Sequence, residues 1–106
     1  KDPFMANMVT VAETPKFKEL VDDYFDEESF EAFKEHIAQN PFEGVLIQQS
    51  QGVRKIRWPS PYGGKSGGYR ILTCYDSDTQ TVWLLLIYAK SNTQTVKGSQ
   101  ARKLRP

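Results

Sequence analysis

Six consecutive apolar residues, Val82 to Ile87, restrict the fold of this chain more than any other feature of its sequence. In a β-strand, successive side chains point to opposite faces of the sheet, and here both sets of side chains are apolar. Such a strand must be covered by other elements on both of its faces. The run, which reaches Ala89 at most, is far shorter than the roughly 18 apolar residues of a membrane span. We therefore expect no membrane partner.

The second half of the chain has the pattern of a β-sheet. Segments rich in β-branched and aromatic residues span Val53–Trp58, Tyr69–Tyr75 and Gln80–Tyr88, which is the composition of strands. The last two segments are joined by Asp76–Thr79, a polar sequence that favours a hairpin turn. Alternating valines in Met8–Ala12 predict one further strand near the start of the chain.

The first half of the chain predicts two helices. Thr14 and Pro15 form a helix start, with a hydroxyl as the N-cap and proline at the first helical position. Asp26 can cap a second helix, and Asn40 with Pro41 ends it. Apolar residues recur at helical spacing in both segments: Phe17, Leu20, Val21 and Tyr24 in the first, and Phe30, Phe33 and Ile37 in the second.

These elements predict an α+β fold in which N-terminal helices pack on a small antiparallel β-sheet. A length of 106 residues fits one domain, which we assign to residues 5–106. Residues 1–4 precede Met5 and are interpreted as an expression-vector remnant. The tail, residues 91–106, has weak periodicity and is compatible with a frayed helix or with none. Because Cys74 is the only cysteine, no internal disulfide can form, and a reducing cytoplasm is the expected location.

Charge is divided unevenly between the two halves of the chain. Residues 1–43 carry eleven Asp or Glu and four Lys or Arg, whereas residues 44–106 carry two Asp and ten Lys or Arg. The segment between Gly44 and Tyr75 has no acidic residue and contains five cations: Arg54, Lys55, Arg57, Lys65 and Arg70. Such a patch is typical of a surface that binds nucleic acid. Charge alone equally allows a solvated basic face that pairs with the acidic half.

Four cations of the predicted sheet can share one face. Alternation places Lys55 and Arg57 on the same side of their strand, while Arg70 begins the next strand and Lys90 ends the one after that. If these strands are neighbours, the four cations converge. Tyr88, two residues before Lys90, points to the same side of its strand as Lys90. Grouped guanidinium and ammonium groups hold a phosphodiester and stabilise the negative charge that develops during its cleavage. The alternative is that they are strand cations that extend into solvent.

The loop between the first two of these strands, residues 59–68, adds candidate RNA contacts. It contains Gly-Lys-Ser but lacks the earlier glycine and the following helix of a nucleotide-binding P-loop. We expect a mobile connection that brings Lys65 over the basic face, with a plain flexible turn as the alternative. Arg54 is a further RNA-binding candidate. Trp58 and Tyr62 can stack on a base, although Trp58 is most simply a core residue.

Other chemistries have little support in the sequence. His36 is the only histidine, so a pair of catalytic histidines is impossible, and a surface or helix-packing role is expected. Cys74 has no histidine partner in view and is interpreted as a small buried residue. The basic half lacks metal ligands apart from Asp76 and Asp78, which fit a turn. We expect neither a metal nor a cofactor.

Three stretches carry a resemblance to a known family. Gly52–Trp58 reads GVRKIRW, Gly64–Ile71 reads GKSGGYRI and Leu86–Asn92 reads LIYAKSN. In this order they resemble the signature stretches of the RelE/ParE toxin superfamily, in its HigB-like, RelE-type branch of type II toxin–antitoxin systems. The resemblance runs from about Thr10 to Lys90 and includes the start of the first helix.

This resemblance implies a microbial-ribonuclease-like fold and an endoribonuclease, an mRNA interferase, that cleaves mRNA on the ribosome without a metal. It implies attack of the RNA 2′-hydroxyl on the adjacent phosphate, and a cognate antitoxin that covers the basic face. Lys55 and Arg57 match the paired strand cations, Arg70 the phosphate-binding arginine, and Lys90, with Tyr88, the last basic position. Since arginine cannot readily act as a base, Lys55 is the first choice for the proton acceptor.

The chain departs from the family pattern at one motif. The usual Tyr-Ala-Lys-Asn-Glu reads Tyr-Ala-Lys-Ser-Asn here, and the tail after it is short and has no tyrosine. Two alternatives therefore stay open beside the nuclease. One is a catalytically silent RNA- or ribosome-binding module with the same fold, and the other is a gyrase-inhibiting, ParE-like toxin. The retained cations favour the nuclease.

Overall fold

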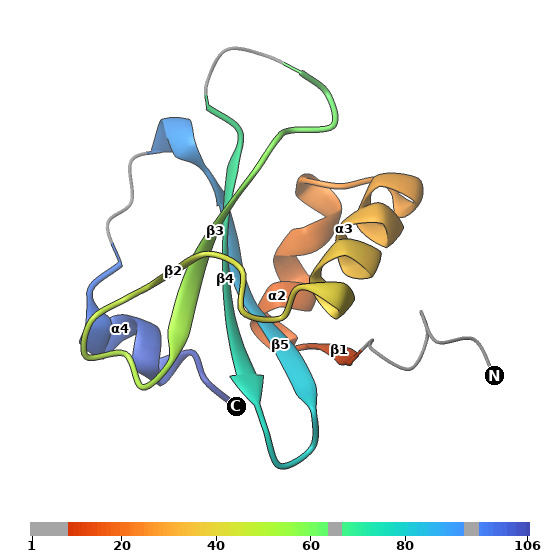
Figure 1. Cartoon of the computed structure of the whole chain (residues 1–106). Coiled ribbons are helices and arrows are strands. Elements are labelled where there is room, and N and C mark those ends of the chain that lie inside the picture. The colour runs from red at the N-terminus through yellow and green to blue at the C-terminus, as the bar shows by residue number, and fades with distance from the viewer. Residues whose placement is uncertain (1–8, 64–66, 93–95) are drawn as a thin grey trace, which may run out of the picture.

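The computed structural model describes residues 9–63, 67–92 and 96–106, which form a five-stranded sheet with helices on both faces (Figure 1). The strands are β1 (Thr10–Glu13), β2 (Val45–Leu46), β3 (Val53–Trp58), β4 (Tyr69–Asp76) and β5 (Thr81–Ala89). The helices are α2 (Pro15–Leu20), α3 (Glu27–Gln39) and α4 (Gly98–Lys103), with 3-10 turns η1 (Val21–Asp23) and η2 (Lys90–Asn92). None of these helices has the length and apolarity needed to cross a membrane.

The order of strands across the sheet is β1-β5-β4-β3-β2. Strands β3 to β5 pair antiparallel, as predicted. The short β2, which the sequence pattern did not predict, pairs antiparallel with β3, whereas β1 pairs with β5 in parallel, so the sheet is mixed. The α+β fold is confirmed, and its antiparallel description needs this one addition. The physical reason is connectivity, because the chain forms two helices and three other strands between β1 and β5. A connection of that length can return the chain beside β1 in the same direction.

Both predicted helices start at the predicted residues. Thr14 caps α2, and its hydroxyl accepts the Phe17 N–H at 3.2 Å and donates to the Leu84 carbonyl at 3.2 Å. This pair of bonds joins the helix start to β5. Asp26 caps α3 and forms a capping box with Ser29. The first helix is shorter than its apolar stripe implies and continues as η1.

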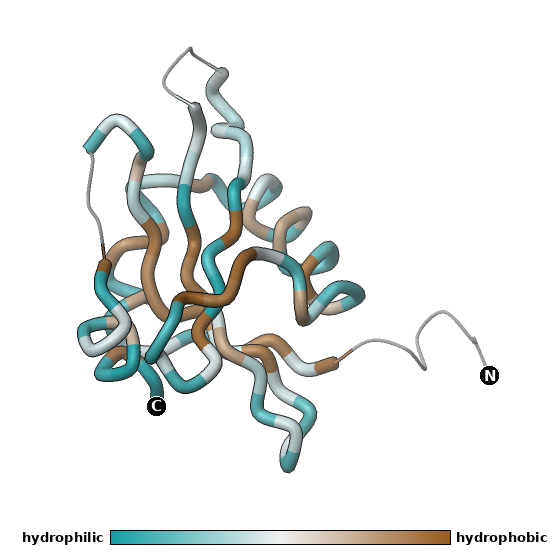
Figure 2. Tube along the Cα trace, turned by 60° about the vertical axis from the view of Figure 1, so that its left-hand side comes forward, coloured by the Kyte–Doolittle hydropathy of each residue, from teal (hydrophilic) through white to brown (hydrophobic). Residues whose placement is uncertain are grey.

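Two apolar cores lie on the two faces of the sheet, as the apolar run in β5 predicts, and the sheet centre is accordingly the most hydrophobic part of the trace (Figure 2). The helical layer of α2, η1 and α3 packs on the face that includes Leu84, and α4 packs on the face that includes Leu85. A β-bulge interrupts the pairing of β4 with β5, because Leu72 pairs with Leu86 but Thr73 with Leu84. Leu85 is the additional residue, and as a result both Leu85 and Leu86 contribute to the core under α4.

The tail, which the sequence leaves undecided, forms α4 and covers part of the second face. Its Ala101 is fully buried in a cluster with Val53, Leu72 and Leu85, and Leu104 packs against that cluster. Because one small side chain makes the central contact, the apolar periodicity of this helix is weak in the sequence.

We expect Ala101→Gln to lower the free energy of unfolding by about 2 to 4 kcal/mol, because a larger polar side chain cannot fit this buried position without displacing α4. Lys103→Gln, at an exposed position of the same helix, is the matched control and should change it by less than about 0.5 kcal/mol. Urea unfolding measures both variants. Equal stabilities would contradict the packing of α4 on the sheet.

Candidate functional site

The register of three strands aligns the predicted site residues. Arg57 of β3 pairs with Arg70 of β4, which pairs with Tyr88 of β5. Directly opposed residues of antiparallel strands project from the same face of the sheet. The three side chains therefore form one row across β3, β4 and β5.

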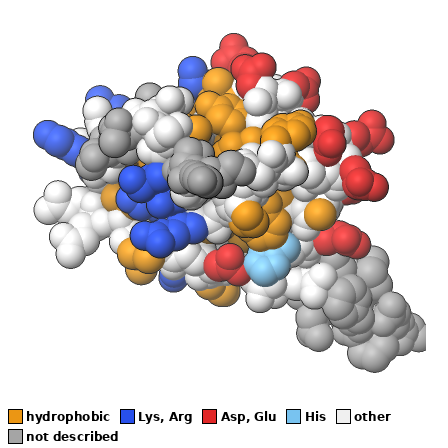
Figure 3. Space-filling view, turned by 90° about the horizontal axis from the view of Figure 1, so that it is seen from above, with side chains coloured by type: hydrophobic (Ala, Val, Ile, Leu, Met, Phe, Trp, Pro, Cys, Tyr) orange, Lys and Arg blue, Asp and Glu red, His pale blue; other side chains and the backbone are white. Residues whose placement is uncertain are grey.

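A pocket of about 570 Å³ brings the four predicted cations together: Lys55, Arg57, Arg70 and Lys90 all line it. The remaining lining residues come from the turn before β2, from β2 itself and from β3: Glu43, Gly44, Val45 and Ile56. Seen from above, Lys and Arg side chains gather in one part of the surface, and most acidic side chains lie on the opposite side (Figure 3). This pocket has the charge and size to hold a phosphodiester.

Arg70 is the most constrained of these cations. It is only 7% exposed, and its Nη1 donates to the Gly67 carbonyl at 3.1 Å and to the Tyr69 carbonyl at 3.2 Å. A guanidinium has five N–H donors in a fixed plane, so two bonds to backbone fix its orientation and leave other donors for a ligand. A guanidinium held in place before a ligand arrives loses less entropy on binding.

Backbone contacts set the distance between Lys90 and the β3–β4 loop. The Lys90 N–H donates to the Gly68 carbonyl at 2.9 Å, and a Cβ on Gly67 would lie 3.2 Å from Lys90 Cγ. Gly68 has φ +74°, and a Cβ there would lie 2.5 Å from the Trp58 carbonyl oxygen. Only glycine fits this approach. The Gly-Gly pair thus allows the loop end to lie against both β3 and the end of β5.

Tyr88, the fifth residue predicted for catalysis, lies beside Arg70 but is not among the lining residues of the pocket, and it keeps its proton. Burial raises the pKa of its phenol above the ordinary value, and the positive charge of Arg70 offsets only part of that effect. Tyr88 is 5% exposed and is Arg70's partner in the sheet register. Chemically it is a neutral hydroxyl that can donate a hydrogen bond beside the cations.

The other predicted RNA contacts lie elsewhere. Arg54 projects toward the helical layer, donates from Nη1 to the Gly44 carbonyl at 3.1 Å and lies over the Phe42 ring. Trp58 packs edge-on against Phe33 in α3, with ring centroids 4.9 Å apart, so its ring belongs mainly to the core. Tyr62 is 66% exposed on the loop and does not line the pocket. Lys65 lies outside the described residues.

A second hollow of about 460 Å³ shares Arg57 with the cationic pocket. Its other lining residues come from the end of β3 and from the loop: Trp58, Pro59, Ser60, Gly63, Gly67 and Gly68. The two hollows therefore adjoin at Arg57.

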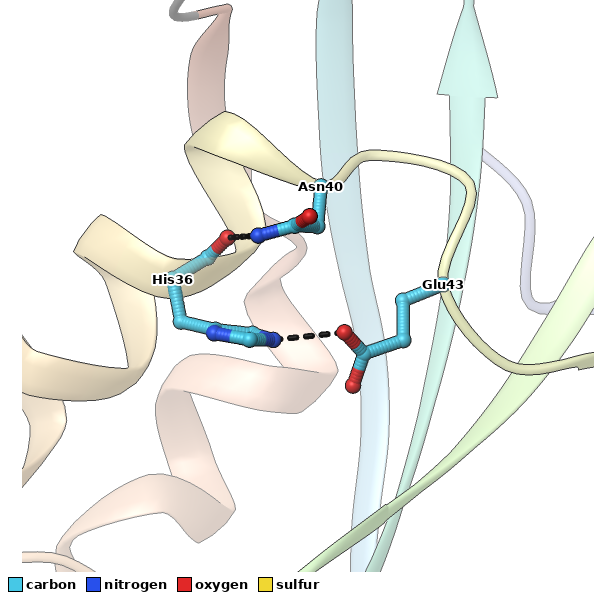
Figure 4. Close-up of polar contacts among 3 residues, drawn as sticks. All are labelled: His36, Asn40 and Glu43. Carbon is cyan, nitrogen blue, oxygen red and sulfur yellow. Dashed lines mark hydrogen bonds and ion pairs between the residues drawn. The ribbon is translucent and has the colours of Figure 1, made fainter.

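Sequence reasoning missed one pair at the rim of the pocket. His36 of α3 and Glu43 form a contact of 2.5 Å between Nε2 and Oε1 (Figure 4). The His36 ring also packs against Trp58, with centroids 5.0 Å apart, which agrees with the helix-packing role predicted for it. The one available signal was that Glu43 immediately precedes the basic segment, but nothing in the sequence links it to the strand cations.

Two further expectations concern Cys74 and metal ligands. Cys74 is buried in the cluster under α4, and burial raises the pKa of its thiol, so it is not an activated nucleophile. Within residues 9–63, 67–92 and 96–106, no group of three or more His, Cys, Asp or Glu is arranged to hold a metal ion.

Comparison with known proteins places the fold. No protein-family model matches the chain. A double mutant of the Escherichia coli toxin RelE in the free state superposes with a TM-score of 0.56 at 12% identity, over 81% of this chain and 87% of that one. The toxin–antitoxin complex RelBE2 of Mycobacterium tuberculosis contains a chain that matches with a TM-score of 0.54 at 18% identity, over 77% of this chain and 98% of that one. The fold that the three sequence stretches implied is thus confirmed, and the chain has the fold of RelE-type toxins.

Proposed function

We propose that this protein is the toxin of a toxin–antitoxin pair and that it cleaves mRNA on the ribosome. The observation that carries the proposal is the convergence of Lys55 and Arg57 of β3, Arg70 of β4 and Lys90, which directly follows β5 in η2, on one pocket. A solvated basic face would not need a buried arginine, whereas Arg70 is buried and held by two carbonyls. Such an arrangement is typical of a site that binds an oxyanion.

The chemistry that suits this pocket is cleavage by the RNA itself. The 2′-hydroxyl attacks the adjacent phosphorus, the bond to the 5′-oxygen breaks, and the products are a 2′,3′-cyclic phosphate and a free 5′-hydroxyl. The phosphate oxygens gain negative charge in the transition state, and Arg57 and Arg70 would stabilise that charge. Lys55 and Lys90 carry protons that the leaving oxygen can accept. Because side chains supply the positive charge, we expect the reaction to need no metal.

The distribution of charge supports RNA and an antitoxin as partners. The acidic residues of α2, η1 and α3 lie in the helical layer, away from the cationic pocket. An RNA surface would attract the pocket and repel the helical layer, so only one orientation of approach is favourable. An acidic or helical antitoxin segment would block the same pocket by the same attraction. One solved structure of this fold is a toxin–antitoxin complex.

Replacement of Arg70 tests the proposed function. We expect Arg70→Ala to reduce cleavage at least about 100-fold, because its donors stabilise charge that develops in the transition state. Arg70→Lys keeps the charge but loses the planar fork, and it should recover only part of the activity. Arg102→Ala, at an exposed position on α4, is the matched control and should cleave as well as the wild type.

Primer extension on a reporter mRNA, in translating and translation-blocked cells, measures these variants. Cuts within codons that require translation and disappear in Arg70→Ala are the expected result. Growth arrest without cuts would instead favour a gyrase-inhibiting toxin. If the cells show neither cuts nor growth arrest, the result favours a catalytically silent binding module.

Replacement of Tyr88 tests the effect of burial on its proton. In alkaline solution the wild-type protein should show one tyrosine absorbance change that Tyr88→Phe lacks. That change should occur at a higher pH than the change of free tyrosine, because burial raises the pKa of Tyr88. The native state then holds this proton more tightly than the unfolded chain does. Stability from Tyr88 is therefore present below about pH 10 and lost as the pH rises above it. Urea unfolding should show a smaller alkaline loss in Tyr88→Phe, and an identical loss would contradict the prediction.

A further inference from the structure

One carboxylate lies among the cations of the pocket. Glu43 lines it together with Lys55, Arg57, Arg70 and Lys90, and it is the one acidic residue among the lining residues described. Within the part of the chain that the structure describes, its ion pair is with His36, and no lysine or arginine nitrogen lies within 4.0 Å of it. The carboxylate is therefore in the pocket without being paired to the cations around it.

The backbone holds this carboxylate in place. Glu43 donates its N–H to the Asn40 carbonyl at 3.1 Å, which closes a turn after α3. The Asn40 side-chain amide donates to the His36 carbonyl at 2.9 Å, and His36 Nε2 contacts Glu43 Oε1. Figure 4 shows these three residues as one local unit, in which the second carboxylate oxygen has no contact drawn to the imidazole. One oxygen is thus held, and among the residues that the structure describes the other oxygen has no hydrogen-bond partner, so it can accept a proton.

Gly44 brings this unit against the strand that carries Lys55. It has φ +99°, and a Cβ at this position would lie 2.7 Å from the Lys55 carbonyl oxygen. Its own carbonyl accepts a hydrogen bond from Arg54 at 3.1 Å. Any larger residue would push the turn away from β3, so the position of Glu43 depends on a glycine that follows it directly.

We propose that Glu43 is the general base of the RNA-cleaving site and that His36 is the residue that positions it. The proposal rests on the function proposed above. The proton of the RNA 2′-hydroxyl moves to the free oxygen of Glu43 as the O2′–P bond forms. The P–O5′ bond breaks, and the 5′-oxygen takes a proton from a lysine ammonium of the pocket. After product release, Glu43 returns its proton and the lysine regains one through solvent, so both groups recover their starting states.

A carboxylate suits this role better than a lysine in the same pocket. A lysine ammonium has three donors and no acceptor, so Lys55 would have to lose a proton before it could take one. An ionised carboxylate accepts at once. The bond from His36 Nε2 to one oxygen fixes the direction of the other, as the orienting partner of a catalytic base does elsewhere. This assigns the base to Glu43 and leaves Lys55 to charge stabilisation or to protonation of the leaving group.

The test measures binding and cleavage separately, with purified toxin and ribosomes that carry a defined mRNA, in single-turnover reactions. Glu43→Gln should lower the cleavage rate by about 100-fold or more, while its affinity for the loaded ribosome stays equal or increases. Formate should restore part of the rate to Glu43→Ala and none to wild type. His36→Ala should lower the rate by a smaller factor, and His36→Gln, which keeps a donor, should recover it. Glu35→Gln, an exposed residue of the same helix, is the matched control.

Each result has one meaning. If wild type cleaves and Glu43→Gln cleaves at the same rate, the assignment of Glu43 is overturned while the nuclease stands. If Glu43→Gln binds more tightly and cleaves at the wild-type rate, the carboxylate only repels RNA from the rim, and the assignment is again overturned. If the wild type itself makes no cut, the proposed function is wrong, and so is the assignment of Glu43 as its general base. Thermal unfolding of each variant identifies any loss of rate that comes from loss of the fold.

Discussion

The pairing of β3, β4 and β5 is the constraint on which the rest of this molecule depends. Side chains alternate along a strand, so a slip of one residue between β3 and β4 would move Arg57 and Lys55 from the pocket face to the helical face. The two apolar cores prevent such a slip, because Ile56 and Val53 must each enter a different one. Burial on both faces of the sheet thereby fixes which cations meet, although none of those cations contributes to either core.

One face of the sheet serves two purposes along its length. At one end, Val53 and Cys74 pair in β3 and β4 and lie under α4. At the other end, Arg57 and Arg70 pair and line the pocket. Lys55 lies between these two ends, opposite Leu72 of the apolar cluster. A short helix is therefore sufficient, since α4 has to cover only the apolar rows of this face.

Local patterns in the sequence predicted the parts of this structure that depend on local physics. The caps at Thr14 and Asp26 and the bounds of β3 follow from residue type and alternation, as does the shared face of Lys55 and Arg57. The sequence could not predict the parallel pairing of β1, because strand direction there depends on the whole intervening chain. The place of Glu43 was hidden for a similar reason. Its contact with the pocket arises only when the turn after α3 lies against β3, an approach that the φ of Gly44 permits.

Gathering four cations in one pocket costs electrostatic free energy, and the site offsets that cost in ways that also suit catalysis. Arg70 is buried but hydrogen-bonded to two carbonyls, which reduces the penalty of removing its charge from water. Glu43 places one negative charge at the rim without forming a close ion pair with any described lysine or arginine. A close pair would have neutralised a phosphate-binding cation and occupied the carboxylate. Held instead by the imidazole of His36, the carboxylate lowers the mutual repulsion of the cations and keeps an oxygen available, so electrostatic balance and proton transfer require the same geometry.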